Sequence, residues 1–192
     1  MQGAVTIPSK IKIDSDTYDV TAIDDDALFM TKITNLKVPK SIATIGIRAF
    51  AESYFITLNS DISGECNWPD WIDRIPDAAC SCANFNQLNI PNNVKSIGID
   101  AFQSCDNLED LHIPDGVIVI KDAFNKCDAL ESVYIPHSVK EIDCNVFHEC
   151  LKLNSITYDG TIDQWKSILV NGEYLHNRFS TIVVHCNDGD TK

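Results

Sequence analysis

Residues 94–114 read VKSIGIDAFQSCDNLEDLHIP, and the same arrangement of apolar positions returns at once. Residues 117–136 answer with VIVIKDAFNKCDALESVYIP, and a third copy begins at Val139 and runs to Tyr158. Each copy carries a V-x-x-I pair, an Ala-Phe or Val-Phe pair, a cysteine and a closing apolar strand pattern. Self-similarity at a period of this length is the signature of a repeat architecture, because each unit must share its core with its neighbours.

The repeat extends toward the N-terminus in weaker form. The units begin at residues 20, 42, 72, 94, 117 and 139, so successive spacings are 22, 30, 22, 23 and 22 residues. The single spacing of 30 marks an insertion near residues 59–71. In the unit that follows the insertion, Ala79 takes the place of the usual Phe. Five prolines share one slot directly after the strand pattern: Pro8, Pro39, Pro91, Pro114 and Pro136.

The pattern predicts two short extended segments per unit. Alternation in L-x-x-L-x-I-P places Leu111 and Ile113 inward and Asp110 and His112 outward, and proline then ends the strand. The V-x-x-I pair is a second extended piece, and Ala-Phe anchors a turn or a brief helix. About six buried apolar side chains per unit give on the order of 9–18 kcal/mol. Ordering the backbone of one unit costs roughly 1–2 kcal/mol per residue, so a unit is stable only in a stack with parallel strands.

The two ends of the stack need different sequences, because an uncovered end exposes the core. Residues 1–19 contain a predicted hairpin that we expect to act as an N-terminal cap. Residues 20–158 hold about six repeats of 22–23 residues, and residues 159–192 form a C-terminal cap. In that cap, residues 161–169 predict a short amphipathic helix, and Thr161 with Gln164 fits a capping box. The whole chain, residues 1–192, is therefore expected to be one domain.

Composition limits the class of partner. The chain has 15 Lys and Arg against 28 Asp and Glu, for a net charge of −13. A field of that sign repels nucleic-acid phosphates and anionic lipid, so neither is an expected partner. No run of 18 apolar residues predicts a membrane span, and the first residues show neither the basic nor the apolar region of a signal peptide.

The units resemble the BspA-like, or treponemal-type, leucine-rich repeat. Residues 94–138 match its L-x-x-L-x-I-P-x-x-V-x-x-I-x-x-x-A-F-x-x-C signature almost slot for slot, and residues 156–165 and 184–189 are similar to its terminal cap. The resemblance covers essentially the whole chain except about residues 59–71. It implies an α/β repeat solenoid: a right-handed leucine-rich-repeat stack with a parallel sheet on the concave face and short extended or helical turns on the convex side. It also implies a secreted or cell-surface protein that adheres to host or matrix proteins or to other cells.

The concave strand face is the first candidate site, because repeat sheets of this kind present columns of outward side chains. Tyr134 is the expected hot spot, since tyrosine is enriched among residues that dominate binding energy. A plain solvated face is the alternative. The outward positions are Asn35, Lys37, Gln87, Asn89, Asp110, His112, Ser132, Tyr134, Ser155 and Thr157.

The insertion offers a second candidate, with Trp68, Asp70 and Trp71 as further ligand contacts. Exposed tryptophans in a loop favour recognition. The preferred interpretation is structural, because large indole rings usually bury where space exists, and the reduced Phe slot at Ala79 leaves space.

The eight cysteines predict no metal site. Cys82, Cys105, Cys127 and Cys150 share one repeat phase and are expected to form a stacked column of free, buried thiols. Cys66 and Cys80 are the one pair outside that column that could be bridged. Cys80-x-Cys82 lacks the second paired motif that a zinc site needs.

No catalytic motif is present, and no cofactor is expected. The sequence has no H-E-x-x-H, no G-x-S-x-G and no glycine-rich phosphate loop. The sequence therefore favours a non-catalytic binding module that takes a protein or glycan on its concave face. The alternative is a structural spacer or assembly unit of a larger surface protein, without a ligand of its own.

Overall fold

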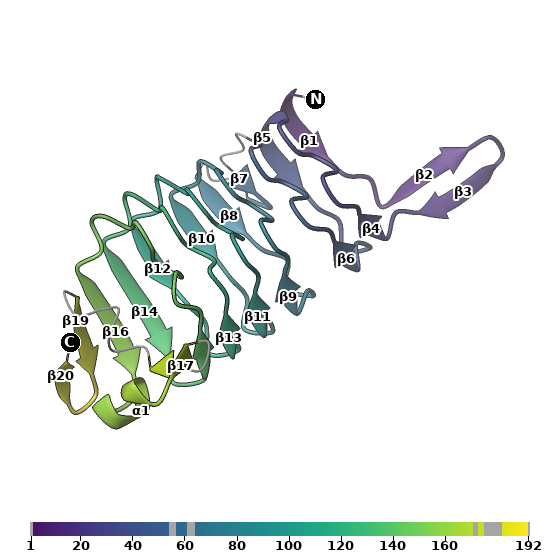
Figure 1. Ribbon diagram of the computed structural model, residues 1–192. Coiled ribbons are helices and arrows are strands. Elements are labelled where there is room, and N and C mark those ends of the chain that lie inside the picture. The colour runs from purple at the N-terminus through teal and green to yellow at the C-terminus, as the bar shows by residue number, and fades with distance from the viewer. Residues whose placement is uncertain (1, 54–56, 61–63, 171–172, 175–181, 192) are drawn as a thin grey trace.

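The computed structural model describes residues 2–53, 57–60, 64–170, 173–174 and 182–191. The chain winds into an elongated stack of turns, and its two termini lie at opposite ends of the stack (Figure 1). Most turns contribute one strand to each of two parallel sheets, which we call the first and the second sheet. The chain is therefore a solenoid, as predicted.

The first sheet holds the longer strands. Its order is β1-β5-β7-β8-β10, then β12-β14-β16-β19, and β20 pairs antiparallel with β19. The ladder is interrupted between β10 and β12, although these two strands still lie in contact. The strands are β1 (Gln2–Thr6), β5 (Lys32–Lys37), β7 (Thr57–Leu58), β8 (Glu65–Asn67), β10 (Gln87–Asn89), β12 (Asp110–His112), β14 (Ser132–Pro136), β16 (Ser155–Asp159), β19 (Val183–Cys186) and β20 (Gly189–Thr191).

The second sheet is built from the V-x-x-I segments, which are extended as predicted. It has two parts, β4-β6 and β9-β11-β13-β15-β17, and β18 pairs antiparallel with β17. The strands are β4 (Ala22–Ile23), β6 (Thr44–Ile45), β9 (Arg74–Ile75), β11 (Ser96–Ile97), β13 (Val119–Ile120), β15 (Glu141–Ile142), β17 (Leu169–Val170) and β18 (Glu173–Tyr174).

The core is one interior row between the two sheets. The rings of Phe102 and Phe124 stack with centroids 5.2 Å apart, and those of Phe124 and Phe147 lie 6.1 Å apart. Around this row are buried the Leu and Ile residues of the first-sheet strands and the apolar pairs of the V-x-x-I segments, except Val20 and Ile45, which are partly buried. The predicted stacking of equivalent slots is confirmed.

The Ala-Phe segments form turns rather than helices. Among the residues that the structure describes, the one helix is α1 (Ile162–Lys166) in the C-terminal cap. Its predicted capping box is present, since Gln164 N donates to Thr161 Oγ1 and Thr161 N donates to Gln164 Oε1. Trp165 of α1 is buried against Tyr158. Within the described part of the chain, no helix is long and apolar enough to cross a membrane.

The predicted cysteine column needs one correction. Cys105, Cys127 and Cys150 are buried as expected, but Cys82 is exposed at a left-handed backbone position with φ 60°. The unit that contains Cys80 and Cys82 is aligned with the other units one residue away from the predicted alignment. Cys80 N donates to Ala101 O just as Phe102 N donates to Ala123 O, so Cys80 occupies the Phe slot and Ala79 the Ala slot before it. All eight cysteines, Cys66 and Cys80 among them, are free thiols.

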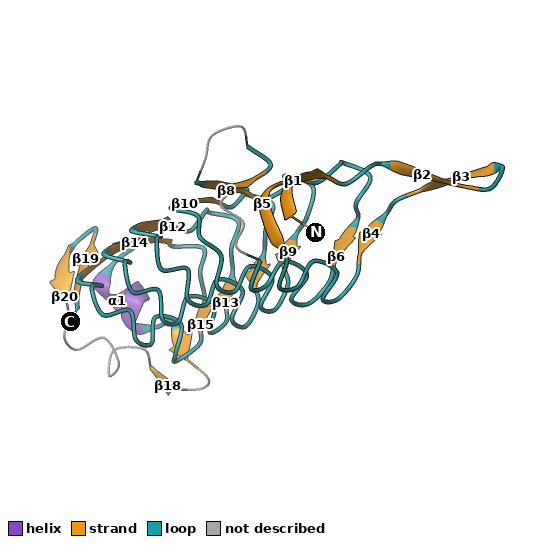
Figure 2. Cartoon of the chain, turned by 90° about the horizontal axis from the view of Figure 1, so that it is seen from above, coloured by secondary structure: helices purple, strands orange, loops and turns teal. Residues whose placement is uncertain are grey.

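The N-terminal hairpin forms but does not cover the core. Strands β2 (Lys10–Ile13) and β3 (Asp16–Asp19) pair antiparallel around the polar turn. All eight of their residues are exposed, and the hairpin projects away from the end of the stack (Figure 2). Ile11, Ile13 and Tyr18 share one face of it, with 43%, 54% and 50% of their surfaces exposed.

Candidate binding face on the first sheet

Strand register arranges the outward side chains of the first sheet in rows that run across the strands. Leu88, Leu111 and Ile156 point into the core, and the residues on either side of each point out. The row toward the carboxyl ends of the strands contains Lys37, Asn59, Asn67, Asn89, His112, Tyr134, Thr157 and His185. The row toward their amino ends contains Asn35, Glu65, Gln87, Asp110, Ser132 and Ser155. Thr57 has the same register but is buried.

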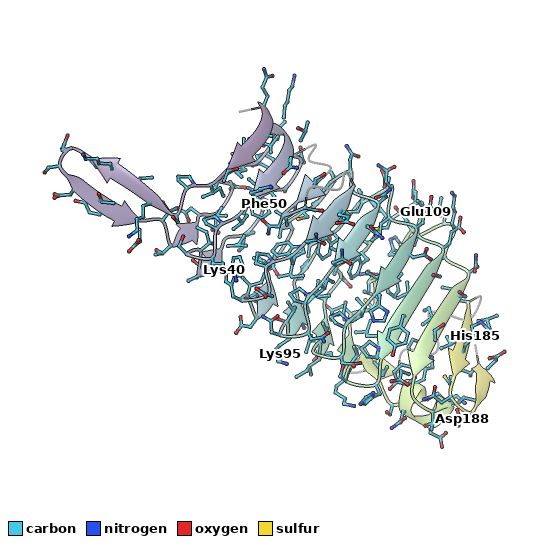
Figure 3. The ribbon with its side chains drawn as sticks, turned by 180° about the vertical axis from the view of Figure 1, so that it is seen from behind. Lys40, Phe50, Lys95, Glu109, His185 and Asp188 are labelled. Atoms are coloured by element: carbon cyan, nitrogen blue, oxygen red, sulfur yellow. The ribbon has the colours of Figure 1, made fainter. Side chains whose placement is uncertain are left out.

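His112 and Tyr134 form an aromatic pair in the middle of the longer row. Their rings are parallel within 2° and their centroids are 4.4 Å apart. His112 is exposed and Tyr134 is half-buried, so the pair is accessible from solvent. Figure 3 shows the side chains on and around the sheets, with Glu109 and His185 labelled.

A charged cluster lies beside the aromatic pair. Asp159 Oδ2 is 3.3 Å from His137 Nδ1, and Asn187 Nδ2 donates to Asp159 Oδ1 at 3.2 Å. These hydrogen bonds, first from Asn187 and then from His137, hold the pKa of Asp159 below its ordinary value. Partial burial, together with the neighbouring Asp159 carboxylate, raises the pKa of Tyr134. The aromatic pair and this cluster together offer an anionic oxygen, a phenol and the imidazole rings of His112 and His137.

The other end of the row is an amide ladder. Asn89 Nδ2 donates to Asn67 Oδ1 at 2.5 Å, and Asn59 Nδ2 donates to Asn67 O at 3.2 Å. Asn59 Oδ1 accepts a hydrogen bond from Val38 N, and this bond fixes the Asn59 side chain against the neighbouring chain segment. Side chains tied together in this way lose less conformational entropy on binding than free ones do.

All ten predicted face residues lie on this one surface, in its two rows. The sequence analysis did not identify four further residues of the two rows: Asn59, Glu65, Asn67 and His185. The reason for three of them is that the insertion was not recognised as strand. The polar–apolar–polar order of Glu65-Cys66-Asn67 is the same as that of Gln87-Leu88-Asn89, and this was the available signal.

The tryptophans of the insertion have a structural role. Trp68 was predicted as a candidate ligand contact, and this is wrong, because Trp68 lies in the core. Only 4% of its surface is exposed, and its ring lies 6.2 Å from that of Phe50 and 6.1 Å from that of Phe102. It fills the space that the small Cys80 leaves in the Phe slot. Trp71 is half-buried, and its Nε1 donates to Ile42 O at 2.7 Å.

Asp70 is exposed, at the rim of a shallow pocket of about 480 Å³. Lys37, Lys40, Asn59 and Asn67 line the same pocket, which joins the insertion to the first sheet. In the described part of the chain, no three His, Cys, Asp or Glu residues are grouped so that they could hold a metal ion.

The repeats match a known pattern. The pattern that defines the BspA type leucine rich repeat region matches residues 6–57 and 73–176 in six copies. Among proteins of curated function, none matches this sequence.

Solved structures share the fold. A leucine-rich repeat protein from Bacteroides ovatus is 30% identical, with a TM-score of 0.68 over 81% of this chain and 39% of its own. A leucine rich cell surface protein from Faecalibacterium prausnitzii is 22% identical, with a TM-score of 0.53 over 80% of this chain and 55% of its own. The pneumococcal vaccine antigen PcpA is 20% identical, with a TM-score of 0.61 over 90% of this chain and 44% of its own. This chain therefore spans about two fifths to about half of the length of these proteins.

Proposed function

The chain belongs to the BspA-type leucine-rich repeat family, and we propose that it is a non-catalytic binding module that takes a protein or glycan on the exposed face of its first sheet. Repeat solenoids bind through extended sheet faces of this kind. Catalysis needs titratable groups gathered in a cleft, which an open sheet face seldom supplies.

The observation that carries the proposal is the row of polar and aromatic side chains from Lys37 to His185. Its side chains make no contribution to the buried core, yet they are aligned, partly hydrogen-bonded to one another and rich in amide and aromatic groups. Amides and charged groups supply hydrogen bonds, and Tyr134 supplies the aromatic anchor on which binding energy concentrates.

The proposed location is the cell surface or the extracellular space, with a partner on a host, matrix or neighbouring cell surface. Two proteins of the same fold support this location: one is named as a cell surface protein and the other as a vaccine antigen. The net charge of −13 favours a partner surface with positive charge.

The test is capture of a partner from mixtures of host and matrix proteins and glycans. The double variant His112→Ala with Tyr134→Ala is expected to abolish saturable binding while the far-ultraviolet circular dichroism and the melting temperature stay close to wild type. Lys95→Ala is the control, because Lys95 is exposed beside the second sheet. Unchanged affinity in the double variant would remove this face from the proposal.

A second candidate function is an assembly unit of a larger surface protein, and the hairpin β2–β3 favours it. An isolated two-stranded hairpin is marginal in water, and this one exposes three large apolar side chains on one face. Sedimentation velocity over a concentration series separates the two functions. Association that is lost in Ile11→Ser with Tyr18→Ser supports assembly, and a monomer at all concentrations contradicts it.

A further inference from the structure

We propose that the interruption of the second sheet between β6 and β9 is a docking groove for an extended, positively charged peptide segment of a partner protein. The segment adds one strand to the sheet at this place. The groove lies on the second sheet and is independent of the binding face proposed above.

The groove exists because the two sheets hold unequal numbers of strands at the insertion. β7 and β8 are both strands of the first sheet, where they pair with each other. In the described part of the chain, the second sheet has no strand between β6 and β9. Neighbouring strands lie about 4.8 Å apart, so a missing strand leaves an opening of about that width.

Backbone carbonyls at the opening lack the donors that their equivalents have. In the other units, the carbonyl at one position accepts from the next unit: Ile23 O from Gly46 N, Ile75 O from Gly98 N, Ile97 O from Lys121 N and Ile120 O from Asp143 N, at 2.8–3.1 Å. A second carbonyl, two residues earlier, does the same in Thr21, Asp73, Lys95 and Ile118. The equivalent carbonyls of Ile45 and Ala43 have no such donor among the described residues, and Pro76, which is aligned with Gly98, has no N–H to donate to Ile45 O. Unpaired groups at a sheet edge are a template for an added strand.

The opening is a wedge that is held in place at its narrow end. On the turn side the two units touch directly, since Arg48 N donates to Asp77 O and Phe50 N donates to Ala79 O, both at 3.0 Å. Trp71 stands between the units and is fixed by its bond to Ile42 O. The groove is therefore formed before any ligand arrives, which reduces the entropy that binding costs.

The lining of the groove selects the chemistry of the segment. The cavity has a volume of about 530 Å³, and one wall runs from Ala43 to Ile47 while the other runs from Trp71 to Arg74. Ile47 is 47% exposed and offers an apolar contact together with Trp71. Asp25 and Asp73 also line it, whereas the one guanidinium, that of Arg74, is paired with Asp77 at 3.2 Å. A strand with alternating apolar and basic side chains complements this lining.

The test uses the full chain and a labelled peptide of sequence Lys-Val-Lys-Ile-Lys-Val, followed by fluorescence anisotropy. Saturable binding is expected, and hydrogen exchange at the Asp73 amide is expected to slow while exchange at Lys95, which already donates to Asp73 O, stays unchanged. Two control peptides are expected not to bind: one with Glu in place of each Lys, and one with N-methylated backbone amides.

The chain offers a matched pair of variants for the same test. Ile47 and Ile99 are both 47% exposed, both follow a glycine, and both have a backbone N–H that donates to an aspartate of the preceding unit. Ile47 lines the groove and Ile99 does not. Ile47→Lys is expected to weaken peptide binding by at least about tenfold through like-charge repulsion, and Ile99→Lys to change it by less than about twofold.

Three results would overturn the proposal: no saturable binding up to millimolar peptide, equal binding of the N-methylated peptide, or equal effects of the two lysine variants. The double variant His112→Ala with Tyr134→Ala is expected to bind the peptide normally. This result separates the test of the groove from the test of the binding face on the first sheet.

Discussion

Phe124 shows at the scale of one residue what holds the stack together. Its ring is buried between Phe102 and Phe147, one ring from each neighbouring unit. Phe124→Ala is expected to cost roughly 3–5 kcal/mol of unfolding free energy, because the cavity would open in the middle of the interior row. Lys95→Ala, on the exposed side, is expected to cost less than about 0.5 kcal/mol. Urea denaturation measures both, and similar losses would mean that inside and outside have been confused.

Ser104 illustrates a second feature of single residues, the left-handed turn position. Its φ is 53°, and the equivalent residues Cys82, Lys126 and Glu149 also have positive φ. Left-handed backbone costs a residue with a side chain roughly 1–2 kcal/mol, a cost that glycine avoids. Ser104→Gly is therefore expected to be more stable than Ser104→Ala by about 0.5–1 kcal/mol.

The control for the Ser104 pair lies at an ordinary backbone position. At Lys95, Gly is expected to be less stable than Ala by about 0.5–1 kcal/mol, because only the flexibility of the unfolded chain differs. Thermal melts of the four variants give the comparison. The same sign at both positions would contradict a left-handed conformation at Ser104.

At the scale of elements, the insertion and the unit after it compensate each other. Trp68 follows β8 directly, and it fills the slot that Cys80, which comes after β9, leaves small. Trp68→Ala is expected to cost roughly 3–5 kcal/mol, and Cys80→Phe alone roughly 1–3 kcal/mol through overpacking against Trp68.

The double variant tests whether the two side chains share one space. Cys80→Phe in the Trp68→Ala background is expected to be more stable than Trp68→Ala alone, because the new ring restores the row between Phe50 and Phe102. Guanidinium denaturation of the double-mutant cycle gives the coupling free energy. A purely additive result would mean that the two side chains do not compete for this slot.

At the scale of the whole molecule, the interruption of the second sheet between β6 and β9 divides the stack into two blocks. Over the described ranges of the chain, the two blocks are joined to each other by fewer backbone hydrogen bonds than neighbouring units within a block. In repeat stacks, stability is approximately a sum of unit and interface terms, so a weak interface allows one side to open first. Residues 2–50 are expected to exchange their amides through an opening of lower free energy than residues 94–158. Native-state hydrogen exchange in low guanidinium measures this.

Trp71→Phe sharpens that prediction, since it removes the bond from the indole N–H to Ile42 O at the interface. The variant is expected to lower the opening free energy of residues 2–50 and to leave that of residues 94–158 unchanged. One common opening free energy for both blocks would show that the interruption does not weaken the stack.

The amino-acid sequence was enough to predict the solenoid, the alternation of its first-sheet strands, the extended V-x-x-I segments, the capped helix and the row of phenylalanines. These predictions were possible because the repeat pattern is regular from Val94 to Tyr158. An apolar position that recurs in each unit can be buried only by stacking on the equivalent positions of the neighbouring units. The ten predicted face residues followed from the same alternation. The hairpin was also predicted, from two alternating segments around a polar turn.

Four features could not be predicted from the sequence: the register around Cys80, the burial of Trp68, the pairing of β8 with β7 and β10, and the exposure of the N-terminal hairpin. Each of these depends on contacts between residues that are distant in sequence, where a one-residue change in spacing moves a side chain from the core to solvent. The unequal strand numbers of the two sheets, and the groove that results, are likewise a property of packing. Spacing within one unit does not contain that information, because it depends on which neighbour each strand meets.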